Sequence, residues 1–195
     1  MKPNTNKPFI IVVTGVATSG KSTLLAQLRL DGTIRGVKFL DMDRAKLPQE
    51  NREIWRLARL EKLFRRAVDN NQNSQSSIIF GIGLPSEIIN SSAYSTDLSV
   101  GYILLTLPIK DYENRMKRRI IKQLGTGAFR RHYVKQWNSE NLAYTRELSR
   151  QLKKEVGHQA NKLIIDTSKL DPIEVSQLAA EYIKLMTIGA IGPSS

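Results

Sequence analysis

The chain contains no cysteine among its 195 residues. Disulfide bonds, thiolate nucleophiles and cysteine-based zinc sites are therefore excluded, and the composition fits a reducing compartment. Long hydrophobic stretches are also lacking. The apolar run FIIVV, which follows the polar start MKPNTNKP, is far too short for a signal peptide or a membrane span. We therefore expect a cytoplasmic protein without a membrane segment.

Acidic side chains are scarce. Asp and Glu number 18 against 30 Lys and Arg, which gives a formal net charge of +12 and a pI near 10.0. Such an excess favours polyanionic partners, namely nucleotides, phosphorylated substrates or nucleic acid, although a basic surface that only aids solubility is an equal alternative. The excess is concentrated between residues 110 and 135, which hold nine Lys or Arg and only two acids. Nothing in the sequence determines the oligomeric state.

Apolar, β-branched segments alternate with segments of helical periodicity along the chain. Strands that alternate with helices require right-handed crossovers, so we expect one three-layer α/β domain over residues 1–195, built on a parallel sheet. In such sheets, ligands bind at the carboxyl ends of the strands. The predicted strands cover residues 9–14, 37–40, 77–82, 100–107 and 162–166, and the predicted helices cover 20–30, 49–69, 110–123, 132–155 and 172–186.

The segment Gly15–Ser22, GVATSGKS, matches the phosphate-binding loop G-x-x-x-x-G-K-[ST] and predicts binding of ATP or GTP. Its glycines let successive backbone N–H groups point at phosphate oxygens, and the helix that begins at Lys21 adds its positive N-terminal dipole. Lys21 is expected to reach the β- and γ-phosphates, Ser22 to ligate Mg²⁺ and Thr23 to contact the α-phosphate. The other nucleotide-binding positions predicted in this loop are Gly15, Val16, Ala17, Thr18, Ser19 and Gly20.

The signatures of several nucleotide-binding classes are missing. The sequence has no D-x-x-G or N-K-x-D of GTPases and no LSGGQ-type transporter signature. The predicted strand 77–82 also lacks the terminal acidic pair of motor-like ATPases. The compact kinases remain, with ATP as the phosphate donor.

Three further segments resemble small P-loop kinases of the shikimate, gluconate and nucleoside-monophosphate kinase type. They are Asp41-Met42-Asp43 after the second predicted strand, YILLTLPIKDYENRMKRR at 102–119 and KLIIDTSKLDPIEVSQL at 162–178. The run FGIGLPSEI is also similar to bacterial ATP-binding proteins of this class whose substrates are unassigned. The resemblance implies a five-stranded parallel sheet in the order 2-3-1-4-5 and ATP-dependent phosphoryl transfer.

Two carboxylates suit this chemistry, because phosphoryl transfer needs an acceptor to be oriented and a metal to be held. Asp41 is the candidate partner of Mg²⁺ through water. Asp43 is the candidate that orients or deprotonates the acceptor, and the two roles are exchangeable. The alternative is that both aspartates only cap a turn before the next helix.

An arginine-bearing lid is expected at about residues 119–131, and a flexible tail at about 187–195. A developing metaphosphate-like charge needs guanidinium groups that close over it and exclude water. We expect Arg119 and one of Arg130 and Arg131 to contact the phosphates or stack on the adenine, and Arg115 to bind the nucleotide. For each single arginine, a solvated surface position is the alternative.

The acceptor side should be bordered by residues 44–66 and 81–95. Arg44, Arg52 and Arg56 are candidates to bind an anionic acceptor, whereas Arg59 is expected on the solvated face of its helix. The leading hypothesis is an ATP-dependent kinase for a small hydroxylated or phosphorylated metabolite, nucleosides and nucleotides included. The alternatives are a nucleic-acid end kinase and an ATP-binding module without transfer activity.

Overall fold

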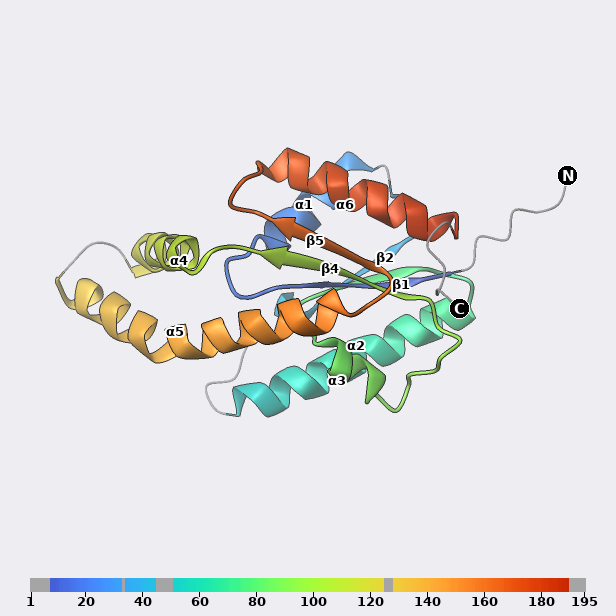
Figure 1. Cartoon of the computed structure of the whole chain (residues 1–195), viewed down its shortest axis with the longest axis horizontal. Helices are drawn as coiled ribbons and strands as arrows, with labels where there is room; N and C mark the ends of the chain where they lie inside the picture. The colour runs from blue at the N-terminus through green and yellow to red at the C-terminus, as the bar shows by residue number, and fades with distance from the viewer. Residues whose placement is uncertain (1–7, 33, 45–50, 125–127, 190–195) are drawn as a thin grey trace, which may run out of the picture.

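The computed structural model describes residues 8–32, 34–44, 51–124 and 128–189; of the side chains, those of Arg44, Arg52 and residues 123–141 lie outside the described part. Five parallel strands form one sheet in the order β2-β3-β1-β4-β5 (Figure 1). The predicted strand order is therefore confirmed. The strands are β1 (Ile10–Thr14), β2 (Lys38–Asp41), β3 (Ser77–Phe80), β4 (Val100–Thr106) and β5 (Lys162–Asp166).

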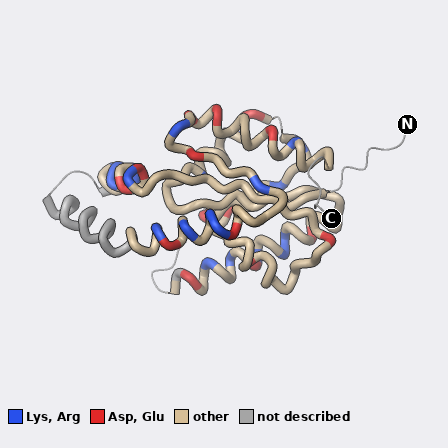
Figure 2. Tube along the Cα trace, in the orientation of Figure 1, with Lys and Arg blue, Asp and Glu red and all other residues tan. Residues whose placement is uncertain are grey.

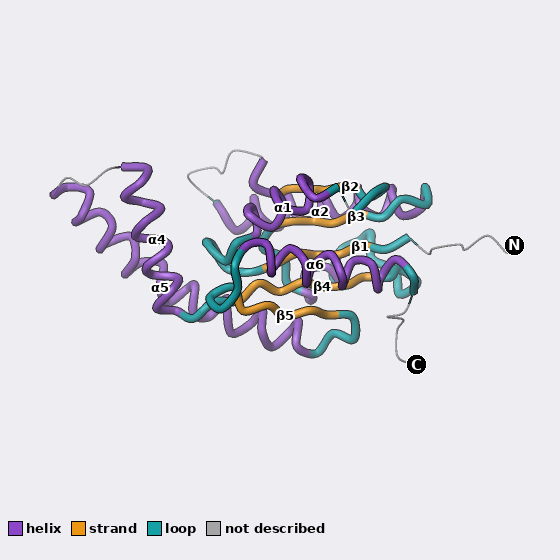
Figure 3. Tube along the Cα trace, turned by 90° about the horizontal axis from the view of Figure 1, so that it is seen from above, coloured by secondary structure: helices purple, strands orange, loops and turns teal. Residues whose placement is uncertain are grey.

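Helices cover both faces of the sheet, which confirms the three-layer architecture. They are α1 (Lys21–Asp31), α2 (Arg52–Gln72), α3 (Pro85–Ile89), α4 (Ile109–Leu124), α5 (Ala128–Gly157) and α6 (Pro172–Thr187), with a 3₁₀ turn η1 at Met42–Arg44. α1 and α6 pack on one face, and α2 and α3 cover the other (Figure 1). α4 projects beyond the carboxyl ends of the strands (Figure 3). Within the described ranges, no helix is long and apolar enough to cross a membrane.

The central strand β1 supplies side chains to two separate cores. Ile10 and Val12 pack with the core under α2 and α3, whereas Ile11 and Val13 pack with the core under α1 and α6. All four side chains are buried, because a strand sends successive residues to opposite faces and both faces are covered. Burial of each such side chain stabilises the fold by roughly 1.5–3 kcal/mol.

The first turns of α2 differ from the buried stripe that helical periodicity predicts. Leu60 and Phe64 are buried, but Ile54 is 68% exposed and Leu57 is 40% exposed. At this end of the helix Arg56 faces the interior, because its guanidinium finds hydrogen-bond acceptors beyond the end of β3. The polar partner therefore overrides the apolar pattern over these turns.

The boundaries of two elements also differ from the prediction. The helix predicted over 49–69 continues to Gln72 as α2, so the connection to β3 is confined to residues 73–76. The side chain of Asn70 donates a hydrogen bond to Ser77 Oγ at 2.9 Å. This bond gives an asparagine, a residue typical of loops, a polar partner within the helix. β3 ends at Phe80, and the turn Gly81–Gly83 follows it.

The turn after β3 approaches the turn after β2 very closely. A Cβ built on Gly81 would lie 2.1 Å from Met42 Sδ and 2.8 Å from Met42 Cβ. Met42 lies between the two predicted site aspartates, so the absence of a side chain at Gly81 sets the position of both carboxylates.

We predict that Gly81→Ala lowers the free energy of unfolding by about 1–3 kcal/mol, because the added methyl group overpacks this contact. Urea denaturation measures the change. Gly157→Ala is the matched control, since a Cβ there would meet no heavy atom within 4 Å. Equal stability of the two variants would contradict the prediction.

Candidate active site

The loop between β1 and α1 closes around the Lys21 side chain. Lys21 Nζ donates hydrogen bonds to the carbonyl oxygens of Gly15 at 2.7 Å and Val16 at 2.9 Å. The backbone N–H of Ser19 donates to Val16 O at 3.2 Å, and Gly20 takes a positive φ of 103°. The loop is thus a closed turn that holds an ammonium group against its own carbonyl oxygens.

Gly15 lies where the loop leaves the sheet. Its φ is +151°, and a Cβ there would come within 2.5 Å of the Leu105 carbonyl oxygen and 2.6 Å of Ser19 Oγ. The loop can therefore bend only if position 15 has no side chain. This is the physical reason for the first glycine of the motif.

Two other predicted site residues, Asp43 and Arg119, act on the charge of Lys21. Burial lowers the pKa of Lys21 to about 8, the Asp43 carboxylate raises it, and the Arg119 guanidinium lowers it. Asp43 and Arg119 are therefore close enough to Lys21 for their charges to act on it. The side chains of Ser22 and Thr23 are exposed in the first turn of α1, beside the same group.

The two aspartates after β2 have different environments. Asp41 is the last residue of β2, and its Oδ1 accepts a hydrogen bond from the Asp43 backbone N–H at 3.0 Å. The Asp43 side chain is exposed, so it is free to meet a ligand. Asp41 thus caps the turn, as the alternative interpretation proposed, and this leaves its second oxygen for another partner. Arg59 Nη2 lies 3.5 Å from the Asp41 carbonyl oxygen, so the prediction that Arg59 lies on the solvated face is wrong.

Arg115 connects the phosphate loop to the segment after β5. Its Nη1 donates to Thr18 O at 3.3 Å and to Thr167 Oγ1 at 3.2 Å, and its Nη2 donates to Thr167 O at 2.6 Å. Arg115 also lines a cavity of about 170 Å³ together with Thr23, Leu170 and other residues of the α1 and α6 side. This cavity lies beside the N-terminus of α1, where the base of a nucleotide bound at the phosphate loop would be expected.

A buried ion pair that we did not predict holds the turn Gly81–Gly83. Arg56 Nη1 and Nη2 donate to the two carboxylate oxygens of Glu87 at 2.8 and 2.5 Å, and Nη1 also donates to Ile82 O at 3.2 Å. Glu87 further accepts from the Leu84 N–H at 2.9 Å and so caps α3. The sequence carried one signal for this role, since a Glu three residues after a helix cap and behind a proline is typical of a capping box.

Several predicted residues fall outside the described part. Arg130 and Arg131 lie on α5, but their side chains are not described, and residues 125–127 of the expected lid are outside the described ranges altogether. The side chains of Arg44 and Arg52 are likewise outside. Their predicted contacts with phosphate or acceptor remain predictions.

The residues that are described fit a bound nucleotide with Mg²⁺. Thr18 Oγ1 and Ser19 Oγ are buried and have no hydrogen-bond partner within the described residues, which suits a loop shaped for a ligand. No cluster of three or more Asp, Glu or His that could hold a metal occurs in the described ranges. Mg²⁺ in phosphate sites needs only one or two protein ligands besides phosphate oxygens and water, which Ser22 and Asp41 can supply.

Comparison with solved structures shows that the fold of this chain is shared with known kinases. A sugar kinase from Janibacter sp. superimposes with a TM-score of 0.58 at 17% identity, over 95% of this chain and 96% of that one. A gluconokinase from Sinorhizobium meliloti gives 0.60 at 16% identity, over 97% and 99%. The chain has the fold of the small P-loop kinases.

A third structure, Bacillus subtilis YorR in complex with phosphorylated GDP, gives a TM-score of 0.54 at 15% identity, over 90% of this chain and 96% of that one. No family model matches the sequence, and no curated protein sequence matches it either. At these identities the P-loop kinase likeness is a likeness of fold, and the chemistry has to be argued from the residues of this chain.

We predict that ATP affinity falls as pH rises above about 8, the pKa of Lys21 in the free protein. Phosphate oxygens favour the protonated ammonium, so binding above this pKa must take up a proton. Affinity should therefore fall by up to about tenfold per pH unit. Calorimetric titration of ATP between pH 7 and pH 9.5 measures this slope. Lys21→Arg keeps a permanent charge and should lose the slope, and an equal slope in both proteins would contradict the assignment.

We also predict that Glu87→Gln lowers the free energy of unfolding by about 1–3 kcal/mol, because it leaves the Arg56 guanidinium buried without its counter-charge. Glu53→Gln is the matched control. Glu53 lies 3.9 Å from Arg56 but is 71% exposed, so its loss should change stability by less than about 0.5 kcal/mol. Chemical denaturation of both variants makes the comparison, and similar losses would show that the Arg56–Glu87 pair does not hold the turn.

Proposed function

We propose that the protein is an ATP-dependent phosphotransferase that moves the γ-phosphate to a small hydroxylated or phosphorylated metabolite. The observation that carries the proposal is the phosphate loop closed around the buried Lys21 ammonium group. Asp43 and Arg119, from two other segments of the chain, lie near enough for their charges to act on it. Phosphoryl transfer needs a lysine that binds phosphate, a carboxylate that the acceptor can reach and a guanidinium group that neutralises the transferred phosphate. A module that only bound ATP would not need the carboxylate there.

The roles of the residues follow from their positions. Lys21 leaves the carbonyl oxygens of Gly15 and Val16 when phosphate replaces them as its partner, and its charge then offsets that of the β- and γ-phosphates. Ser22, with Asp41 through water, holds Mg²⁺, which supplies further neutralisation of the phosphate charge when bound. Arg119 neutralises the transferring group from the α4 side, and Arg130 or Arg131 is proposed to join it.

Asp43 is proposed to accept the proton of the acceptor hydroxyl or to orient that hydroxyl for in-line attack. Its backbone N–H is fixed by Asp41 Oδ1, and its side chain is exposed and so accessible to an acceptor. Arg59, which contacts the Asp41 carbonyl oxygen, and the turn Gly81–Gly83, which packs against Met42, border the residues that carry Asp43. The acceptor is proposed to bind beside Asp43 on this side of the sheet.

Nucleotides belong among the acceptors to be tested, since the structural neighbour YorR was solved with phosphorylated GDP. A nucleic-acid end kinase is the second candidate, and the charge of α4 favours it. Figure 2 shows Lys and Arg along this helix, and Lys110, Lys117, Arg118, Arg119 and Lys122 are exposed. Such an activity should bring strongly salt-dependent binding of oligonucleotides.

We predict transfer of labelled phosphate from ATP to one class of acceptor when metabolite pools and oligonucleotides are screened, with Lys21→Ala as the blank. Asp43→Asn should lose roughly 10²–10⁴-fold in turnover, the usual contribution of a general base, while it still binds ATP. Asp69→Asn, an exposed carboxylate on α2 outside the site, is the matched control and should keep full activity.

The outcomes separate the hypotheses. If the wild type and Lys21→Ala give the same signal in every pool while the wild type binds ATP, the protein is an ATP-binding module. If Asp43→Asn turns over like Asp69→Asn, the transfer does not depend on the carboxylate assigned here.

A further inference from the structure

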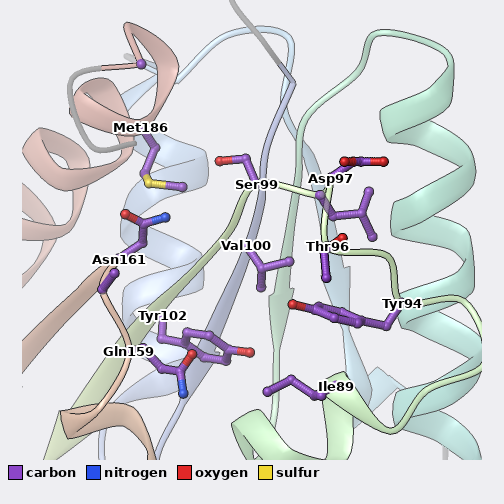
Figure 4. A pocket seen from close by; sticks show the side chains of 13 residues that line it. Ile89, Tyr94, Thr96, Asp97, Ser99, Val100, Tyr102, Gln159, Asn161 and Met186 are labelled. Carbon is purple, nitrogen blue, oxygen red and sulfur yellow. The ribbon is translucent and has the colours of Figure 1, made fainter. Parts of the chain in front are cut away.

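A second cavity lies at the opposite end of the sheet from the phosphate loop. Its volume is about 490 Å³, and it is lined by the start of β4, the loop before it, the residues that precede β5 and the end of α6 (Figure 4). Small-molecule sites usually measure about 300–1,000 Å³. The seven residues of β4 separate it from the phosphate loop by roughly 20 Å.

The described lining of this cavity lacks the positive charge that predominates in the sequence. The chain carries a net charge of +12, yet the described residues that line the cavity include no Lys, Arg or His, and Asp97 is their one charged residue. A site for phosphate or another anion needs cationic or convergent N–H donors. Because Asp97 is exposed, the rest of the described lining is uncharged, and it suits an uncharged molecule better than an anion.

Amide groups and phenol rings supply the polar part of the lining. Figure 4 shows the hydroxyl groups of Tyr94 and Tyr102 turned toward one another, with the carboxamides of Gln159 and Asn161 on the β5 side. Burial raises the pKa of Tyr102 above its usual range, so its hydroxyl stays a hydrogen-bond donor. The cavity thus presents both donors and acceptors next to flat aromatic surfaces.

Asn161 carries an unmet hydrogen-bonding requirement at this cavity. Its side chain is 8% exposed, and its Oδ1 has no donor within the described residues. A buried carbonyl oxygen without a partner is destabilising, so native proteins usually satisfy it. Figure 4 shows the nitrogen of this carboxamide on the cavity side and the oxygen turned away from it. A half-turn of the broad terminal torsion exchanges the two atoms and lets the oxygen accept a donor from a molecule in the cavity.

We propose that this cavity is a second binding site, for an uncharged nucleobase or nucleoside. A carboxamide pairs its donor and acceptor with the donor–acceptor edge of a base, which is how Asn and Gln recognise bases elsewhere. Phenol rings provide the surface against which an unpaired base packs. The lack of cations among the described lining residues favours the nucleoside over its phosphates.

The test is calorimetric titration of the full chain with adenosine, guanosine, cytidine and uridine, and with the 5′-monophosphate of each. At least one nucleoside should bind saturably, with the same affinity in the wild type and in Lys21→Ala, because the site is remote from the phosphate loop. In competition against the bound nucleoside, its monophosphate should bind at least about tenfold more weakly, a readout that does not register monophosphate bound at the phosphate-loop end. Ser99→Phe fills the cavity from the β4 side and should abolish binding, whereas Ser95→Phe on the same loop, outside the lining, should not.

A second variant keeps the test decisive if Ser99→Phe fails to fold. Asn161→Leu removes the carboxamide at similar size and should weaken the nucleoside about tenfold, the usual effect of one lost buried hydrogen bond. ATP binding verifies that each variant is folded. The proposal is overturned if no nucleoside binds saturably, or if Lys21→Ala alters the nucleoside affinity. It is also overturned if the monophosphate binds as tightly as the nucleoside, or if folded Ser99→Phe and Asn161→Leu bind the nucleoside like the wild type.

Discussion

Gly15 lies where the chain leaves β1 beside the end of β4. A Cβ at this position would lie 2.5 Å from the Leu105 carbonyl oxygen, so no other residue fits there. Because the backbone turns at this point, the carbonyl oxygens of Gly15 and Val16 face inward and hold the Lys21 ammonium group. The rest of the site is arranged around that buried charge. Asp43, which follows β2, and Arg119 on α4 both alter the pKa of Lys21 through their charges.

The site is assembled by the sheet order rather than by proximity in sequence. β1 lies between β3 and β4, so the turns after β2 and β3 flank the phosphate loop on one side and α4 approaches from the other. Side-chain bonds then fix the loops relative to one another. Arg115 joins the phosphate loop to the segment after β5, and Arg56 with Glu87 anchors the turn after β3. Such charge-assisted bonds are stronger than neutral ones and hold geometry that loops alone would not keep.

The distribution of charge gives the two ends of the sheet opposite chemistry. Lys21 and Arg119 lie at the carboxyl ends of the strands, and further exposed Lys and Arg side chains lie along α4. At the amino ends, the cavity beside β4 is lined by hydroxyl and carboxamide groups. The net charge of +12 is therefore an average over regions whose described side chains differ in charge.

The strand order was implied only by the resemblance to small P-loop kinases, whereas the sequence by itself determined the phosphate loop, the central strand and the place of Asp41 and Asp43 after β2. These features are local or periodic, so the residues that define them are neighbours in the chain. Only the tertiary structure decided that Arg56 and Arg59 turn inward, that Ile54 is exposed and that Arg115 braces two loops. The partners of Arg56 and Arg115 are 31, 52 and 97 residues away in the chain, and no local pattern encodes such a pairing. The cavity beside β4 has the same origin, because its walls meet only after the sheet has formed and α6 has packed against it.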